Sequence, residues 1–327
     1  MAKIQYSKDL CKSLLEAANP AGLKIRHRPV RYEEGDELRI NLKGVCPAVE
    51  GSATLVIDKF LGGGFAGQVY RCRLSDLALP PDGEPIPGLE NGTLYAVKII
   101  IPPSTFSRRF RNMIYWLAFQ GPFSSQVNYG ACRSGLLLQK LVRRAAKQKF
   151  DRETAIKDAY ASFWDSNLNA YGEITEWIEG RMWHLEADDE LIGRKNWKTV
   201  DLNETGSPEY IAKRRFMNDM VGLMHEMGAP EFARQYEWWT MKSQPNCMKR
   251  TDLPDCDGPG DGLCAIDFRA GLALLPWLPM SPGDIKLIFD GLFKRKTLVQ
   301  FDRCDTEQMK DFFEEHRWIF NDAPMRQ

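Results

Sequence analysis

The sequence predicts an α+β protein, because it combines strand-like segments with helical ones. Residues 68–74 alternate between the two sides of an extended chain, and residues 54–60 are also strand-like. Residues 207–228 have helical spacing, with Ser207 as the N-cap and Pro208 in the first turn. The 327 residues, of which 43% are hydrophobic, suffice for one large domain or two lobes.

Charge is distributed unevenly along the chain. Lys and Arg together number 44, as do Asp and Glu, so the net charge indicates no partner. Residues 98–149 nevertheless contain ten basic residues and no acidic one. We expect this stretch either to contact an anionic membrane surface peripherally or to pair with the acidic C-terminal half, and we do not expect a nucleic-acid partner. No stretch of about 18 apolar residues and no secretory signal pattern occur, which predicts a cytoplasmic location.

A glycine-rich stretch at residues 62–67, GGGFAG, suggests a loop that lets phosphate approach the backbone. A P-loop would need Lys and Ser or Thr after the last glycine, where the chain has Gln68 and Val69. A dinucleotide-binding turn would need a helix to begin there, whereas residues 68–74 have a strand pattern. The stretch is therefore predicted to be the tip of a β-hairpin.

The next predicted strand, GTLYAVKIIIP, contains one charged residue, Lys98. An unpaired buried charge is costly, so this ammonium must reach an anion or a carboxylate. A hairpin with a glycine tip, followed by a strand with a single lysine, favours phosphate binding over an ordinary hairpin with an exposed lysine.

The combined pattern, from the glycines to Ala-Val-Lys at residues 96–98, resembles the nucleotide loop and ATP-orienting lysine of protein kinases. It is most similar to the UbiB-like atypical kinases, over about residues 54–275. The resemblance implies a bilobal kinase-like fold with an antiparallel β N-lobe, inserted helices and a mostly helical C-lobe. It divides the chain into an N-terminal extension (1–50), an N-lobe with a basic helical insertion (51–180) and a C-lobe with a C-terminal helix (181–327).

The same resemblance implies ATP and Mg²⁺ as cofactors. Glu153, or Asp158 as its rival, would pair with Lys98, although Glu153 could equally be a solvated helix charge. Backbone groups from Glu176 to Ile178 would bind adenine. The residues implied to contact the nucleotide in the first half of the chain are Gly62, Gly64, Gly67, Val69, Ala96 and Lys98.

A short apolar strand ending in Asp267-Phe268 resembles the kinase motif whose aspartate holds magnesium. Asn246 fits the second metal ligand. Met241, however, stands five positions before Asn246, where the catalytic aspartate is expected, and methionine cannot accept a proton. Glu231 or Glu237 could replace that base. Lys98 and Asp267 are thus the implied catalytic residues.

These features support three functional hypotheses. The first is an atypical kinase or ATPase that binds Mg-ATP and transfers phosphate to an unknown protein or small-molecule acceptor. The second is a catalytically inactive pseudokinase scaffold. The third is a module that binds a membrane or nucleic-acid surface through its basic stretch.

Overall fold

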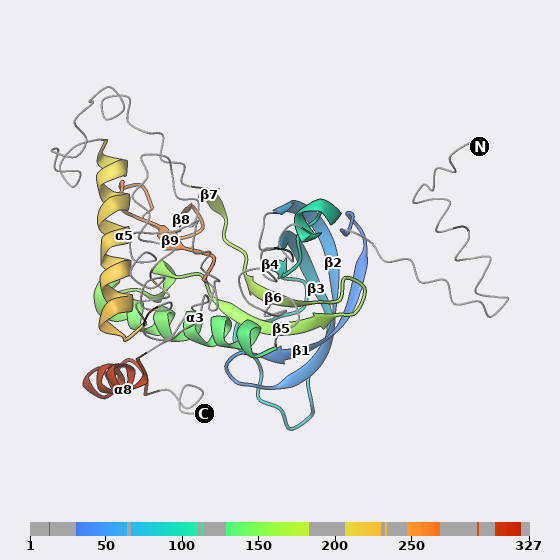
Figure 1. Ribbon diagram of the computed structural model, residues 1–327, viewed down its shortest axis with the longest axis horizontal. Helices are drawn as coiled ribbons and strands as arrows, with labels where there is room; N and C mark the ends of the chain where they lie inside the picture. The colour runs from blue at the N-terminus through green and yellow to red at the C-terminus, as the bar shows by residue number, and fades with distance from the viewer. Residues whose placement is uncertain are drawn as a thin grey trace.

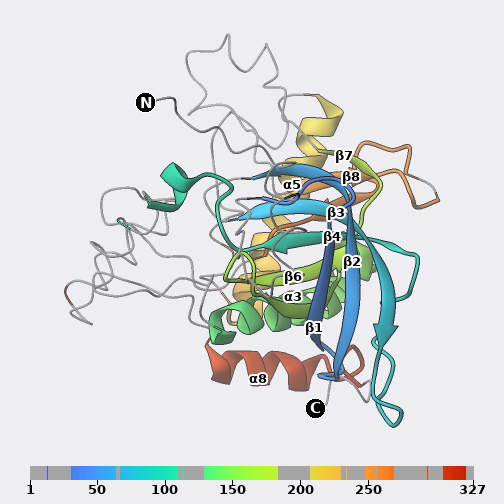
Figure 2. The ribbon, with the colours of Figure 1, turned by 90° about the vertical axis from the view of Figure 1, so that its right-hand side faces the viewer.

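A computed structural model of the chain describes residues 31–63, 67–109, 129–182, 207–229, 247–254, 256–268 and 305–321, with the single residues Ser13, Met113, Ala233 and Phe293. The dominant feature is a closed barrel of antiparallel strands in the order β1-β2-β3-β4-β6-β5 (Figures 1 and 2). Its strands are β1 (Glu37–Gly44), β2 (Glu50–Gly63), β3 (Gln68–Ala78), β4 (Leu94–Ile99), β5 (Ala159–Asp165) and β6 (Ala170–Glu176).

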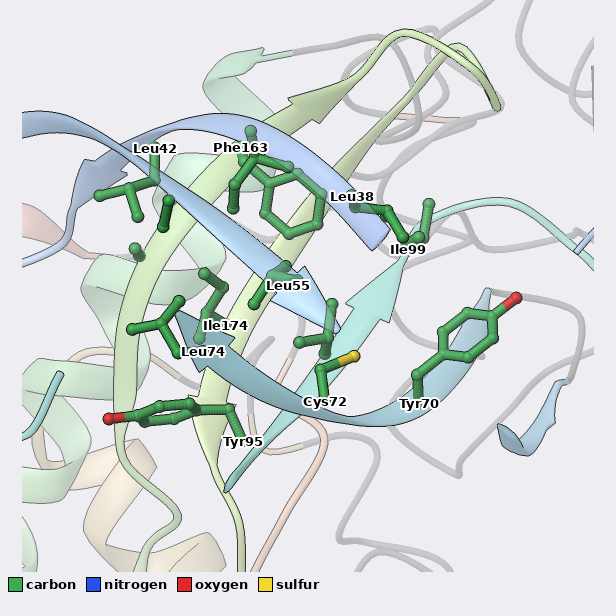
Figure 3. Packing of buried hydrophobic residues seen from close by; sticks show 14 of the residues in the cluster. Leu38, Leu42, Leu55, Tyr70, Cys72, Leu74, Tyr95, Ile99, Phe163 and Ile174 are labelled. Atoms are coloured by element: carbon green, nitrogen blue, oxygen red, sulfur yellow. The ribbon is translucent and has the colours of Figure 1, made fainter. Parts of the chain in front are cut away.

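The barrel closes because β1 pairs with β2 along one edge and with β5 along the other. Leu42, for example, lies opposite Gly51 on β2 and opposite Phe163 on β5. Every second residue of β1 is buried, as expected for a strand with one face toward a core. The interior is filled by apolar side chains from all six strands, and Figure 3 shows those of Leu38, Leu55, Tyr95 and Ile174 among them.

A second group of elements lies beside the barrel (Figure 1). It contains a three-stranded antiparallel sheet in the order β7-β8-β9 and helices that pack into a second apolar core with it. These elements are α3 (Tyr129–Phe150), η1 (Glu153–Ala155), β7 (Gly180–Met182), α5 (Pro208–Glu226), β8 (Cys247–Arg250), β9 (Leu263–Ala265) and α8 (Thr306–Glu315). The long helix α3 runs along both groups and contacts β5, β6 and α5.

Several local predictions are confirmed. The predicted strands at 54–60 and 68–74 lie in β2 and β3, and the lysine strand is β4. The helix α5 begins at Pro208, and the Ser207 hydroxyl accepts a hydrogen bond from the Tyr210 N–H at 3.2 Å. Gly228, just beyond its end, has φ of 75°, a left-handed conformation that favours glycine.

The predicted bilobal kinase-like fold is wrong, and so is the resemblance to UbiB-like atypical kinases and pseudokinases. The N-terminal part is a closed six-stranded barrel, not an open lobe sheet, because β1 joins β2 to β5. That strand lies inside residues 1–50, which were expected to be an extension. The described part of residues 181–327 is not mostly helical either, since a three-stranded sheet accompanies α5 and α8.

Candidate anion-binding site

The Lys98 ammonium on β4 forms an ion pair with the Asp267 carboxylate, which follows β9. The sequence singled out both residues, and the fold brings them together across 169 positions. The Lys98 side chain is 17% exposed and that of Asp267 35%, so the pair is half-buried but accessible. An accessible pair of this kind can exchange its internal contacts for a phosphate and a cation.

Asp267 has an unusual backbone conformation. Its φ is 63°, in the left-handed region that few residues other than glycine adopt. Such conformations persist only where the surrounding structure enforces them, and they cluster at functional sites. Here the preceding strand is anchored, because the Lys157 N–H donates to the Ala265 C=O at 3.1 Å.

Gly67, directly before β3, lies against the end of the lysine strand β4. Val69 on β3 is directly opposite Lys98 on β4. At Gly67 a Cβ atom would lie 2.5 Å from the Ile99 C=O, so only glycine allows the turn to approach β4 this closely. Gly62 has φ of 145°, which also favours glycine, whereas Gly64 lies outside the described residues.

Ala96 is buried, and its C=O accepts from the Thr175 hydroxyl at 2.9 Å.

A third lysine, Lys157, has its backbone N–H bonded to Ala265, two residues before Asp267. The pKa of Lys157 is lowered to about 8, first by burial and next by the positive charge of Lys98, while Asp267 acts in the opposite direction. Lys157 was not predicted as a site residue. Its one sequence signal is a lysine beside apolar neighbours in AIKDAY.

The carboxylates predicted to pair with Lys98 contact other cations. Glu153 forms an ion pair with Arg144 at 2.7 Å, and Asp158 forms one with Lys140 at 2.6 Å. Both carboxylates therefore balance the basic face of α3. The structure pairs Lys98 with Asp267.

Glu176 joins the barrel to the small sheet. Its carboxylate accepts from the Arg250 guanidinium on β8 and lies 3.7 Å from the Arg143 guanidinium on α3. Its backbone N–H donates to the Asp158 C=O at 3.0 Å. Arg250, which sequence reasoning also missed, is 3% exposed.

Ile178, two residues beyond Glu176, is also only 3% exposed. Within the described ranges, no hydrogen bond engages its peptide N–H or C=O. Buried peptide groups are nearly always paired, so the backbone of Ile178 departs from the usual pattern.

The described part of the basic stretch 98–149 pairs largely with the protein's own carboxylates. On α3, Lys140, Arg143, Arg144 and Lys149 form ion pairs with acidic residues of the segment 153–219. This arrangement corresponds to the internal pairing expected as the alternative to membrane contact. Among the described residues, no helix combines the length and apolar character needed to cross a membrane.

The predicted metal site is only partly described. Asp267 is in place, whereas Asn246, Met241, Glu231 and Glu237 lie outside the described residues. The described residues contain no group of three or more His, Cys, Asp or Glu side chains placed to hold a metal ion.

The comparisons with known proteins assign no family. No protein-family model matches the chain, and a search of curated proteins finds no match.

Proposed function

We propose that the chain binds a nucleoside triphosphate together with Mg²⁺ and acts on it as an ATPase or phosphotransferase. The observation that carries the proposal is the Lys98–Asp267 ion pair on the strand that Gly67 approaches closely. Lysine is a common ligand of the phosphates in nucleotide sites, and a glycine turn lets phosphate approach backbone N–H groups.

Each member of the pair has a distinct role in this proposal. Lys98 would neutralise the phosphates, and Asp267 would bind the magnesium ion that accompanies them, with Asn246 as a further ligand. Mg²⁺ is commonly held by one or two carboxylates plus substrate phosphates, so a dedicated protein cage is not required. Phosphoryl transfer depends mostly on positioning and charge neutralisation, which these two side chains could supply.

A nucleotide, rather than inorganic phosphate alone, would place its base against the backbone near Ile178. A nucleobase presents both donors and acceptors along its edge, and a buried peptide N–H and C=O complement such an edge. This part of the proposal keeps the expectation that backbone groups from Glu176 to Ile178 bind adenine.

Calorimetric titration with ATP, with and without Mg²⁺, tests the proposal. Asp267→Asn should remove the magnesium-dependent part of the affinity, whereas Asp257→Asn, an exposed loop carboxylate, should not. If Asp267→Asn binds Mg-ATP as tightly as the wild type, the assignment of the metal ligand fails.

Turnover then separates an enzyme from a nucleotide-binding scaffold. ATP hydrolysis and transfer to a panel of protein and small-molecule acceptors should exceed the Asp267→Asn background. Tight Mg-ATP binding without turnover would favour the scaffold. Peripheral binding to anionic membranes receives less support, because Lys140, Arg143, Arg144 and Lys149 on α3 are already paired with carboxylates.

A further inference from the structure

We propose that a groove on the outside of the barrel binds a proline-rich peptide in the extended polyproline II conformation. The groove has a volume of about 570 Å³ and is lined by residues of β1, β2, β5, β6 and by the first residue of α3. None of the described lining residues belongs to the candidate anion-binding site, so the inference goes beyond the proposed nucleotide function. It is carried by the aromatic side chains of the groove, by their hydrogen-bonding groups and by the balance of charge around them.

Three aromatic side chains line this groove. Trp164 on β5 lies directly opposite Tyr171 on β6, with ring centroids 4.7 Å apart, and Tyr129 at the start of α3 lies 5.7 Å from Tyr171. The neighbouring Phe163 belongs to the barrel core, so alternation along β5 places Trp164 on the outer face. Trp164 is 38% exposed and Tyr129 43%, so both offer apolar area to a ligand.

The orientation of the rings favours an extended peptide. The planes of Trp164 and Tyr171 are inclined by 67°, and those of Tyr129 and Tyr171 by 52°. Rings that are tilted in this way form the walls of a groove, whereas stacking of a single sugar ring or base needs one flat face. Polyproline helices dock into grooves lined by aromatic side chains, because their conformation is already fixed before binding.

The polar groups of the groove also suit a proline-rich chain. Trp164 carries an indole N–H, and Tyr129 and Tyr171 carry phenolic O–H groups that can donate. The Ser162 hydroxyl accepts from the Arg133 guanidinium at 3.3 Å, which leaves its own O–H to donate to a ligand. Proline residues present carbonyl acceptors and no N–H, so a run of prolines matches a groove that is rich in donors.

The charges around the groove balance one another. The Lys43 ammonium on β1 forms an ion pair with the Glu50 carboxylate on β2 at 3.0 Å. Arg133, which is 8% exposed, donates to the Lys43 C=O at 3.1 Å and is buried against the lining residues. A nucleic-acid strand needs a row of accessible cations, whereas the accessible cation of this groove already has a carboxylate partner. An uncharged peptide segment therefore matches the groove better.

Calorimetric titration with decaproline tests the inference, and a Gly-Ser peptide of equal length is the flexible control. The wild type should bind decaproline and not the Gly-Ser peptide. Trp164→Ala should weaken decaproline binding about tenfold, because it removes one aromatic wall. Tyr171→Phe should weaken it about threefold, because it removes one donor and keeps the ring. Trp318→Ala, at a tryptophan outside the groove that is 62% exposed, should bind as the wild type does.

Labelling of the wild type gives a readout that does not depend on the folding of a variant. Decaproline, but not the Gly-Ser peptide, should protect Tyr129 from nitration by tetranitromethane, equally with and without Mg-ATP. If decaproline does not bind, or if it binds Trp164→Ala as tightly as the wild type and leaves Tyr129 unprotected, the inference is overturned and the nucleotide proposal stands. Protection of Tyr129 by oligothymidylate or cellohexaose in place of decaproline would assign the groove to nucleic acid or saccharide and overturn it equally.

Discussion

The Arg250 guanidinium on β8 donates to the Glu176 carboxylate on β6, and this contact joins the small sheet to the barrel. Both side chains are well shielded, with exposures of 4% for Arg250 and 16% for Glu176. Because Asp267 follows the neighbouring strand β9 and Lys98 lies on the neighbouring strand β4, the same contact helps to hold the candidate site together.

Breaking this pair should destabilise the fold. Arg250→Met removes the guanidinium that balances the charge of the shielded Glu176 carboxylate. We therefore expect a loss of about 3 kcal/mol in the free energy of unfolding. Urea denaturation of the wild type and the variant measures this loss. The exposed pair Arg181–Glu209 is the control, since Arg181→Met should cost at most about 1 kcal/mol. Equal losses in the two variants would contradict the structural role of Arg250.

Lys213 on α5 should make stability depend on pH. Its side chain is 1% exposed, and burial lowers its pKa from 10.5 to about 8. The folded protein therefore binds this proton less well than the unfolded chain does. Stability should be lowest below about pH 8 and rise as the pH approaches 10.5, by an amount on the order of 3 kcal/mol.

Lys213→Met removes this titrating group and should reduce the dependence by about half, leaving the similar rise that Lys157 contributes in the same direction. Urea denaturation at several pH values between neutral and moderately alkaline provides the measurement. A variant that keeps the full wild-type slope would show that Lys213 is not the source.

The turn between β2 and β3 should tolerate no side chain at Gly67. A Cβ atom there would lie 2.5 Å from the Ile99 C=O, so Gly67→Ala must displace either the turn or the end of β4. We expect lower thermal stability and weaker Mg-ATP binding. Gly222→Ala is the matched control, because that helical position has open space and alanine should stabilise α5 by about 0.5–1 kcal/mol. If both variants bind Mg-ATP equally well, the turn does not contribute to the site.

The local elements and the two members of the central ion pair could be singled out from the sequence because their signals are local, although their pairing with each other was not predicted. Alternation marks β3, capping residues mark α5, and a single charge in an apolar strand marks Lys98. Asp267 follows the short apolar strand β9, and this position at the end of an apolar run made it stand out in the sequence.

The closure of the barrel could not be predicted in the same way. It depends on the pairing of β1 with β5, which lie far apart in the sequence, and no local pattern indicates that register. The partners of Glu153 and the positions of Lys157 and Arg250 depend on the same long-range arrangement. The resemblance to kinases predicted an open sheet, and this prediction is wrong because β1 pairs with both β2 and β5 and closes the barrel.

The melting temperature in the presence of Mg-ATP tests the central claim most directly. A ligand at about a hundredfold excess over its dissociation constant stabilises the folded state by about 2.7 kcal/mol, enough to raise the melting temperature by several degrees. The account predicts this rise for the wild type and for Lys59→Ala, an exposed barrel lysine, but not for Lys98→Ala. An equal rise in Lys98→Ala, or no rise in the wild type, would contradict the assignment of the phosphate site to Lys98 and Asp267.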